Sequence, residues 1–394
     1  MSEWKTYRLG EFAEINPRIS LKQGNEFSFV EMKDLDATFK YVSPSIKKEL
    51  KGGSKFQNGD TLFARITPCL ENGKICQVKN LENNVGFGST EFLVFRGREN
   101  ISNSDFVYYL SRSEFIKNNA IQMMTGTSGR QRVEKSALEE LEIIVPNLST
   151  QTQIAQILTS LDDKIELNLQ INQTLEAMAQ ALFKEWFVNF NFPGFDGKLE
   201  NGLPKGWKQE PMDENIEFLN GLALQKFPSL NEDDFLPVIK IRELKQGFTN
   251  ASDKASTELP EKYVIYDGDI LFSWSGSLEV ILWCEGKGAL NQHLFKVSSN
   301  IYPKWFYFFW VREYLPLYKS IAEGKATTMG HIQRRHLTDT IINVPYKDLM
   351  NLSDSILSPI LDKIQENKIQ IQTLTQTRDT LLPKLMSGKI EITK

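Results

Sequence analysis

Two loops of the sequence combine basic side chains with glycines, a combination typical of contacts to phosphate. The first loop is TGTSGRQR at 125–132, where Arg130 and Arg132 stand near Gly126 and Gly129. Glycine lets the backbone approach a phosphate oxygen closely, and arginine supplies charge together with hydrogen-bond donors. This loop is therefore a candidate contact to nucleic acid.

The second loop, GKATTMGHIQRR at 324–335, has the same character and carries Lys325, His331, Arg334 and Arg335. Arginine and lysine pair with guanine edges, and asparagine or glutamine pairs with adenine, so such loops can also read bases. A solvated surface charge is the alternative for any one of these residues, but the set as a whole predicts contacts to DNA. Further candidates lie on or beside strand-like segments: Lys33, Arg65, Lys74, Lys240, Arg242 and Trp274.

Signatures of catalysis are absent or incomplete. The three histidines form neither HExxH nor a recognisable triad, and the three cysteines lack the spacing of a zinc site. NVPY at 343–346 departs from the Asn-Pro-Pro-Tyr loop of amino-methyltransferases and is interpreted as a strand end. We predict no catalytic residue and no metal site in this chain. The alternative is a stand-alone DNA-modifying enzyme, which methylation by the purified chain alone would support.

The composition indicates an ordinary globular chain. Its 394 residues leave room for two domains or more at roughly 150 residues each. The net charge is −4, and no segment is strongly basic, so a DNA-binding surface must be local or shared with a partner. There is no apolar run of about 20 residues and no signal-peptide core, so we expect a cytoplasmic protein that does not enter a membrane.

The chain contains an internal repeat. LDDKIELNLQINQTL at 161–175 recurs in register as ILDKIQENKIQIQTL at 360–374. NGDTLFARITPCLENGKI at 58–75 likewise matches DGDILFSWSGSLEVILW at 267–283. Each half therefore has the order globular region, strand ending in Val-Pro, and long helix.

Apolar residues at seven-residue spacing predict the two long helices. The first should start at a capping box of Thr150 and Gln153 and close at Pro193-Gly194; the second should start near Ser358-Pro359 and end at Pro383 and Gly388. A single apolar seam on so long a helix must pack against a second helix. We therefore expect the two helices to form an antiparallel pair in which Asn168 faces Asn367. Burial in an ordinary core is the alternative. The predicted pairing residues are Ile154, Leu158, Leu161, Ile165, Asn168, Leu175, Leu182, Ile364, Asn367, Ile371, Leu374 and Leu381.

The globular regions alternate strand-like runs with loops, and each has one aromatic-rich helix, at 104–119 and around 303–315. We predict a mixed α/β fold with an internal pseudo-two-fold repeat, in which two similar globular domains are separated by an antiparallel coiled coil. The predicted boundaries are 1–148 and 191–350 for the globular domains, and 149–190 and 351–394 for the helices.

Four phrases, in this order, carry a family resemblance: WKTYRLGEFAEINPR at the start, AQALFKEWFVNFNFPGF at 179–195, LPKGW at 203–207 and RDTLLPKLMSGKIEI at 378–392. With them the chain resembles, over nearly all its length, a specificity subunit of a type I restriction-modification system. The resemblance implies two target recognition domains that each read one half of a bipartite double-stranded DNA sequence.

The same resemblance implies partners. The two helices would dock two adenine methyltransferase subunits, and restriction subunits can join them. No cofactor is expected in this chain, whereas S-adenosylmethionine, ATP and Mg²⁺ are expected in the partner subunits. The recognition domains vary freely within this family, so no base-contacting residue is carried over to this sequence. A coiled-coil adaptor that binds only proteins remains an alternative and would show no dependence on DNA.

Overall fold

The structure is a computed structural model that describes residues 4–229, 233–324 and 330–392. The chain divides into two compact units. The first combines Met1–Leu167 with Thr373–Lys394, and the second is Asn168–Gln372. Both units contain sheets and helices, so the predicted mixed α/β class is confirmed. Lys325, a predicted contact, lies outside the described residues.

The first unit holds two main sheets. The five-stranded sheet has the order β2-β10-β7-β8-β4, and the four-stranded sheet has the order β5-β3-β9-β6, in which β3 and β9 are parallel. Strand β7 is buried at every position, as expected for the central strand of a covered sheet. The bounds are β2 Ala13–Ile15, β3 Glu26–Val30, β4 Tyr41–Val42, β5 Ile46–Glu49, β6 Ser54–Gln57, β7 Thr61–Ala64, β8 Ile75–Val78, β9 Val85–Gly88 and β10 Phe92–Gly97.

The second unit repeats this topology. Its sheets have the orders β15-β22-β19-β20 and β17-β16-β21-β18, and β16 and β21 are again the parallel pair. In addition, β1 (Lys5–Arg8) pairs with β11 (Glu142–Val145) as β14 (Lys208–Pro211) pairs with β23 (Ile341–Val344). The other bounds are β15 Glu217–Asn220, β16 Leu236–Ile239, β17 Lys254–Ala255, β18 Val264–Ile265, β19 Ile270–Ser273, β20 Val280–Leu282, β21 Gly288–Leu290 and β22 Leu294–Ser298.

The repeat extends to single hydrogen bonds. In each unit an aspartate just before the central strand accepts a hydrogen bond from the backbone amide three residues earlier. The same aspartate pairs with a cation on the neighbouring strand: Asp60 with Arg96 at 2.7 Å, and Asp269 with Lys296 at 2.8 Å. Sequence similarity between the halves therefore reflects equivalent packing.

Two expectations for the shorter helices need correction. The segment 104–119 is not one helix but two, α2 (Ser104–Arg112) and α3 (Glu114–Gln122). Ser113 separates them because its ψ of 146° is extended and its side chain accepts a hydrogen bond from the Ile116 amide, which caps the second helix. Helix α7 (Lys304–Glu323) runs beyond the predicted end near residue 315.

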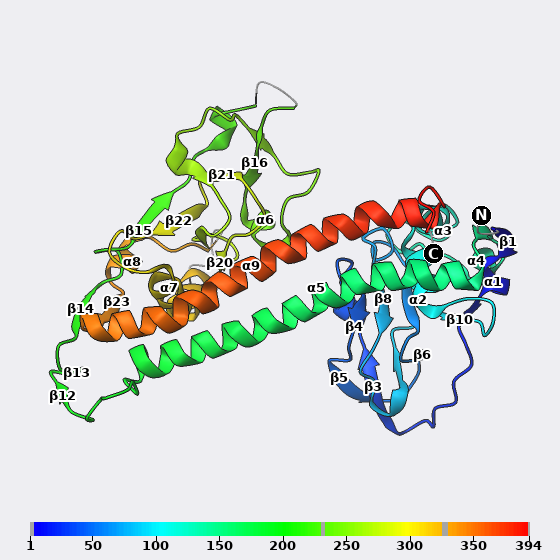
Figure 1. Cartoon of the computed structure of the whole chain (residues 1–394), viewed down its shortest axis with the longest axis horizontal. Helices are drawn as coiled ribbons and strands as arrows, with labels where there is room; N and C mark the ends of the chain where they lie inside the picture. Colours follow the sequence, from blue (N-terminus) through cyan, green and yellow to red (C-terminus); the bar gives the residue numbers. More distant parts are fainter. Residues whose placement is uncertain (1–3, 230–232, 325–329, 393–394) are drawn as a thin grey trace. The chain divides into compact units, whose positions relative to one another are not determined.

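The two long helices are α5 (Leu148–Phe183), which continues as a π-helical turn over Lys184–Val188, and α9 (Lys347–Met386); Figure 1 shows each as one continuous helix. The predicted capping box is wrong. Asn147 caps α5 instead, because its Oδ1 accepts a hydrogen bond from the Thr150 amide at 3.0 Å.

The predicted start of α9 is also wrong, since the helix begins at Lys347 and Pro359 lies inside it. At the other end, Pro383 lies in the last turn and the helix ends at Met386, just before Gly388 with its φ of 70°, close to the predicted end. A proline within a helix removes one backbone hydrogen bond and disfavours the preceding turn. Here Leu357 and Leu361 are buried in the core of the second unit on either side of Pro359, and this packing carries the helix through.

The helices run antiparallel within each unit. In the second unit, Asn168 Nδ2 donates to Gln370 Oε1 at 2.7 Å, and Asn367 Nδ2 donates to Asn172 Oδ1 at 2.9 Å, so numbers rise along α5 as they fall along α9. The expected Asn168–Asn367 hydrogen bond is therefore replaced by two amide contacts to other residues. The helix register sets Asn367 opposite Asn172, one turn further along α5.

The predicted pairing residues differ in burial. Six are buried: Ile154, Leu158, Ile165, Asn168, Ile364 and Asn367. The others are half-buried: Leu161, Leu175, Leu182, Ile371, Leu374 and Leu381.

Candidate nucleic-acid interface

In the first unit the basic loop 125–132 folds back onto the end of β7. Arg132 forms β-bridges with both Thr125 and Ile66, and the Val133 amide donates to the Arg65 carbonyl at 2.9 Å. The Arg65 amide in turn donates to the Glu91 carbonyl at 2.9 Å. Three segments therefore meet, and we call them together the first junction: residues 65–67, 89–91 and 130–134.

The second unit builds the same arrangement from equivalent segments. The Ile332 amide donates to the Trp274 carbonyl at 3.0 Å, the Trp274 amide donates to the His293 carbonyl at 3.4 Å, and Ser275 forms a β-bridge with His331. Trp274 thus takes the place of Arg65, and His293 that of Glu91. We call this set the second junction: residues 274–276, 291–293 and 330–334.

The side chains of the first junction are charged. Arg132 binds Glu91 with two nitrogens, Nε at 2.9 Å from Oε2 and Nη2 at 2.7 Å from Oε1. Arg65 binds Glu134 at 2.9 Å. The hydrogen bond from Arg132 holds the pKa of Glu91 below its usual value against the effect of partial burial. The junction therefore presents fixed guanidinium donors and fixed carboxylate acceptors side by side.

The side chains of the second junction are mostly aromatic. The Trp274 ring lies 5.8 Å from the His293 ring and 6.3 Å from the His331 ring, centroid to centroid, and its Nε1 donates to Asn220 Oδ1 at 3.0 Å. Ser275 Oγ lies 3.1 Å from His293 Nδ1. One backbone framework therefore carries two different side-chain chemistries in the two units.

Comparisons with known proteins agree with the resemblance seen in the sequence. Residues 1–177 match the family described as the type I restriction modification DNA specificity domain. The MjaIX specificity subunit of Methanocaldococcus jannaschii, a type I restriction enzyme component, is 25% identical over 99% of this chain and 94% of its own length. This chain is related to the type I specificity subunits. The predicted resemblance is confirmed.

Further relatives extend the agreement to the whole chain. The type I HindI specificity subunit of Haemophilus influenzae is 27% identical, and the alignment covers 99% of this chain and 100% of that relative. A crystal structure of a type I restriction-modification S subunit from M. genitalium superposes with a TM-score of 0.55 at 15% identity, covering 100% of this chain and 97% of that one. At this identity the superposition shows a shared fold and no more.

Several of the other predicted contacts are cations that pair with carboxylates close to them in sequence. Lys33 pairs with Glu31 at 2.5 Å and Arg242 with Glu243 at 2.7 Å, and Lys240 pairs with Asp253. Glu31 accepts hydrogen bonds from Lys33, which has the larger effect, and from Lys48, and these lower the pKa of Glu31 to about 2. These cations lie on other elements than the two junctions: Lys33 on the 3-10 turn Met32–Asp34, and Lys240 and Arg242 at the start of α6 (Ile241–Gln246).

The remaining predicted cations fall into two groups. Lys74 Nζ donates to the Met32 carbonyl at 2.8 Å, and Arg334 donates to the Phe218 carbonyl at 3.1 Å, so backbone oxygens hold both. Arg130 and Arg335 are exposed, and among the residues that the structure describes neither has a side-chain partner. These two are the cations most available to an external anion.

The acceptors of both junctions are not among the predicted contacts. Glu91, Asn220 and His293 are single polar residues at strand ends, and nothing in their local sequence marks them. The internal repeat could have found Glu91 and His293, because both precede an equivalent strand, β10 in one unit and β22 in the other.

A groove in the first unit was not predicted either. Its volume is about 730 Å³, and it is lined by residues 16–20 and 53–55 and by Val94. Two cations, Arg18 and Lys55, face it, and the Ser54 hydroxyl donates to the Phe92 carbonyl at 2.7 Å, which ties one wall to the strand that follows the first junction.

Two further properties hold for the described part of the chain. It contains no group of three or more His, Cys, Asp or Glu side chains placed to hold a metal ion. Nor does any helix within it have the length and apolar character needed to cross a membrane.

Proposed function

We propose that this chain is the non-catalytic DNA-specificity subunit of a type I restriction-modification complex, in which each unit reads one half of a bipartite target. The observation that carries the proposal is the repeated junction. Both units form it with the same backbone hydrogen bonds, but Arg65 and Glu91 in one are replaced by Trp274 and His293 in the other. Two half-sites of different sequence require a repeated scaffold with exchanged side chains.

The first junction has the groups to read a G·C pair. Arginine donors fit the O6 and N7 acceptors of guanine, and a glutamate accepts from N4 of cytosine. Because Glu91 and Glu134 already hold Arg132 and Arg65, these side chains are oriented before DNA arrives, which lowers the entropic cost of ordering them. Arg130, together with Arg18 and Lys55 of the groove, supplies the charge for the phosphates.

The second junction has the groups to read an A·T pair. Gln292 adjoins His293, and its amide offers the donor and acceptor that fit adenine. The half-buried Trp274 ring, fixed through its Nε1 by Asn220, offers an apolar surface of the kind that contacts the thymine methyl group.

The negative net charge of the chain favours partner subunits that contribute part of the contacts to the DNA phosphates. A net charge of −4 is unusual for a protein that covers an extended duplex alone. We propose that two adenine methyltransferase subunits dock on α5 and α9 and supply both the missing positive charge and S-adenosylmethionine. ATP and Mg²⁺ would be used by restriction subunits that join this assembly.

The test is to map methylated adenines in cells that make this chain with its methyltransferase partner. R132A should relax the sequence requirement in one half of the target only, and W274A in the other half only. R8A is a matched control, because Arg8 pairs with Glu140 at 2.7 Å in the same unit but on its exposed surface. If both substitutions alter the same half, or if neither alters the target, the junctions do not read DNA. An assembly with the methyltransferase partner that shows no selective binding to any DNA would favour a protein-binding adaptor instead.

A further inference from the structure

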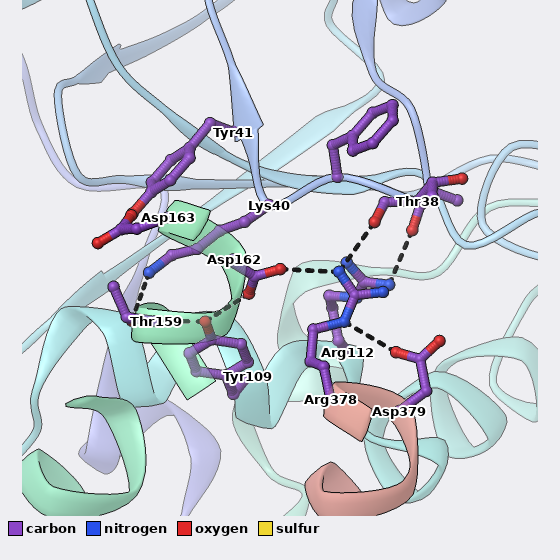
Figure 2. A network of polar contacts seen from close by, with 12 residues as sticks. Thr38, Lys40, Tyr41, Tyr109, Arg112, Thr159, Asp162, Asp163, Arg378 and Asp379 are labelled. Atoms are coloured by element: carbon purple, nitrogen blue, oxygen red, sulfur yellow. Dashed lines mark hydrogen bonds and ion pairs between the residues drawn. The ribbon is translucent and has the colours of Figure 1, made fainter. Parts of the chain in front are cut away.

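A buried ion pair joins the two long helices in the first unit. Asp162 of α5 and Arg378 of α9 are 3% and 2% exposed, and Arg378 Nη1 lies 2.7 Å from Asp162 Oδ1 (Figure 2). Arg378 also donates to the Thr38 carbonyl at 2.9 Å and to Asp379 at 2.8 Å, while the Tyr109 hydroxyl donates to the second oxygen of Asp162 at 2.5 Å. Each charge therefore has the partners that it needs to remain buried.

The internal repeat replaces this pair with apolar residues in the second unit. The repeated sequence aligns Asp162 with Leu361 and Arg378 with Ala179. Leu361 and Ala179 are 3% and 0% exposed, in the apolar core of that unit. Asn172 of α5 and Asn367 of α9 lie opposite each other. Ala179 lies two helical turns after Asn172, and Leu361 lies nearly two turns before Asn367. Because the helices are antiparallel, Ala179 and Leu361 therefore also lie opposite each other.

This difference matters because α5 and α9 are copies of one another. Their seams share residues such as Ile165 with Ile364 and Asn168 with Asn367, so α5 could also pair with the α5 of a second copy of the chain. In that pair, Asp162 would face Ala179 of the other copy. In a pair of two α9 helices, Arg378 would likewise face Leu361. In the α5 pair Asp162 loses its arginine, and in the α9 pair Arg378 keeps only the exposed Asp379 beside it on its own helix. Both arrangements therefore leave a buried charge without the partner that compensates for its burial, which is destabilising.

We propose that the Asp162–Arg378 pair selects the pairing of α5 with α9 and rejects pairing of like helices between two copies of the chain. The attractive part of the selection is small, because a buried ion pair often contributes no more stability than apolar residues of similar size. The selection comes from the penalty on the wrong partners. The device keeps two different recognition units in one folded chain, and the proposal holds whether or not those units bind DNA.

The test uses full-length chains in which Cys69 is replaced by serine and two cysteines are introduced, N168C and N172C. When α5 pairs with α9, the new thiols face Gln370 and Asn367 and have no thiol to meet. When α5 pairs with α5, the thiol at position 172 of one copy faces the thiol at position 168 of the other, because Asn168 is the repeat equivalent of Asn367. Mild oxidation then links the two copies, and a non-reducing gel measures the linked fraction.

Four chains are compared. The parent and R378K both keep a cation opposite Asp162, and we expect few linked dimers from either. D162L/R378A copies the apolar pair that the second unit already uses, and A179R/L361D makes the ionic pair available to like helices as well. We expect at least a tenfold rise in the linked fraction for D162L/R378A, for A179R/L361D, or for both. A linked fraction that rises in neither, or that rises as much in R378K, would overturn the proposal.

Discussion

Glu91 restrains Arg132 at the place where the first junction meets DNA in our proposal. The carboxylate accepts hydrogen bonds from two nitrogens of the guanidinium, so it orients the arginine and also cancels its charge. An arginine held in this way discriminates between bases better than it attracts phosphates. Selectivity and general affinity should therefore change in opposite directions when the glutamate is neutralised.

E91Q should bind DNA more tightly and less selectively. One additional cation becomes available to phosphates, so the slope of log affinity against log salt should steepen by about 0.9. Binding titrations at several salt concentrations on target and scrambled duplexes measure both effects. E140Q is the control, since Glu140 pairs with Arg8 on the exposed surface and its loss should leave the slope unchanged.

Glu31 should make the stability of the first unit depend on pH. Lys33 and Lys48 lower its folded pKa to about 2, below the usual value of 4.5. The contribution of this carboxylate to stability is then complete above pH 4.5 and is lost as the pH falls through about 2. E31Q should be less stable than the parent at pH 7 and equal to it near pH 2, as measured by urea unfolding. A constant difference at all pH values would contradict this assignment.

The long helices place two equivalent asparagines in different environments. Asn168 Oδ1 is buried, and among the residues that the structure describes it has no hydrogen-bond partner; the amide nitrogen of the same side chain donates to the exposed Gln370. Asn367 is paired with Asn172, which is itself buried. We therefore expect identical residues at equivalent positions of the repeat to affect stability in opposite directions.

N168L should raise the free energy of unfolding by about 1 kcal/mol, because it removes an unpaired buried oxygen while Gln370 can bond to water. N367L should lower it by roughly 1–3 kcal/mol, because it leaves Asn172 Oδ1 buried without its donor. Urea unfolding of the two variants under identical conditions provides the comparison. Equal shifts in the same direction would show that the seam does not distinguish the two amides.

For the molecule as a whole, the boundaries between the two compact units fall inside the long helices, between Leu167 and Asn168 and between Gln372 and Thr373. Residues added at both boundaries lengthen α5 and α9 together and leave every contact within each unit unchanged. The boundaries are therefore the place to test whether the helices set the spacing of the target.

Inserting one heptad after Leu167 and another after Gln372 adds ~10.5 Å at ~1.5 Å per residue. Duplex DNA rises ~3.4 Å per base pair, so the unread gap between the half-sites should lengthen by about 3 base pairs. Both half-sites should keep their bases. The added base pairs also rotate one half-site about the duplex axis relative to the other, which should reduce activity. Mapping of methylated sites gives the gap directly. A single insertion, in α5 alone, should abolish selective binding, and an unchanged gap in the double insertion would rule out a spacer role.

The isolated chain should bind its target weakly, because its net charge is −4 and most of its predicted contact cations are paired within their own unit. Addition of the methyltransferase partner should restore both affinity and selectivity. Measuring affinity for target and scrambled duplexes with and without the partner tests this. Tight selective binding by the chain alone would be evidence against shared phosphate contacts.

The sequence by itself determined the repeat, the mixed α/β class, the two long helices and the family resemblance. These follow from patterns that are local or that recur along the chain, such as apolar residues seven apart and the two versions of one helical phrase. The tertiary structure decided the ends and partners of the elements. Pro359 lies within α9 because the burial of Leu357 and Leu361 outweighs the local preference of proline for a helix end. Thr150 and Asn147 are both suitable caps for α5, and the structure shows that Asn147 takes the role.

The composition of the candidate site was also decided in three dimensions. Arg65, Glu91 and Arg132 are far apart in sequence and meet only because β7 pairs with β10 and the basic loop folds back on both. Asn168 and Asn367 appeared to be partners, but the register of the helices gave each a different amide. Nothing in the local sequence marks Asp162 and Arg378 as buried or paired. Their burial depends on the antiparallel contact of two segments more than 200 residues apart, which no local pattern encodes.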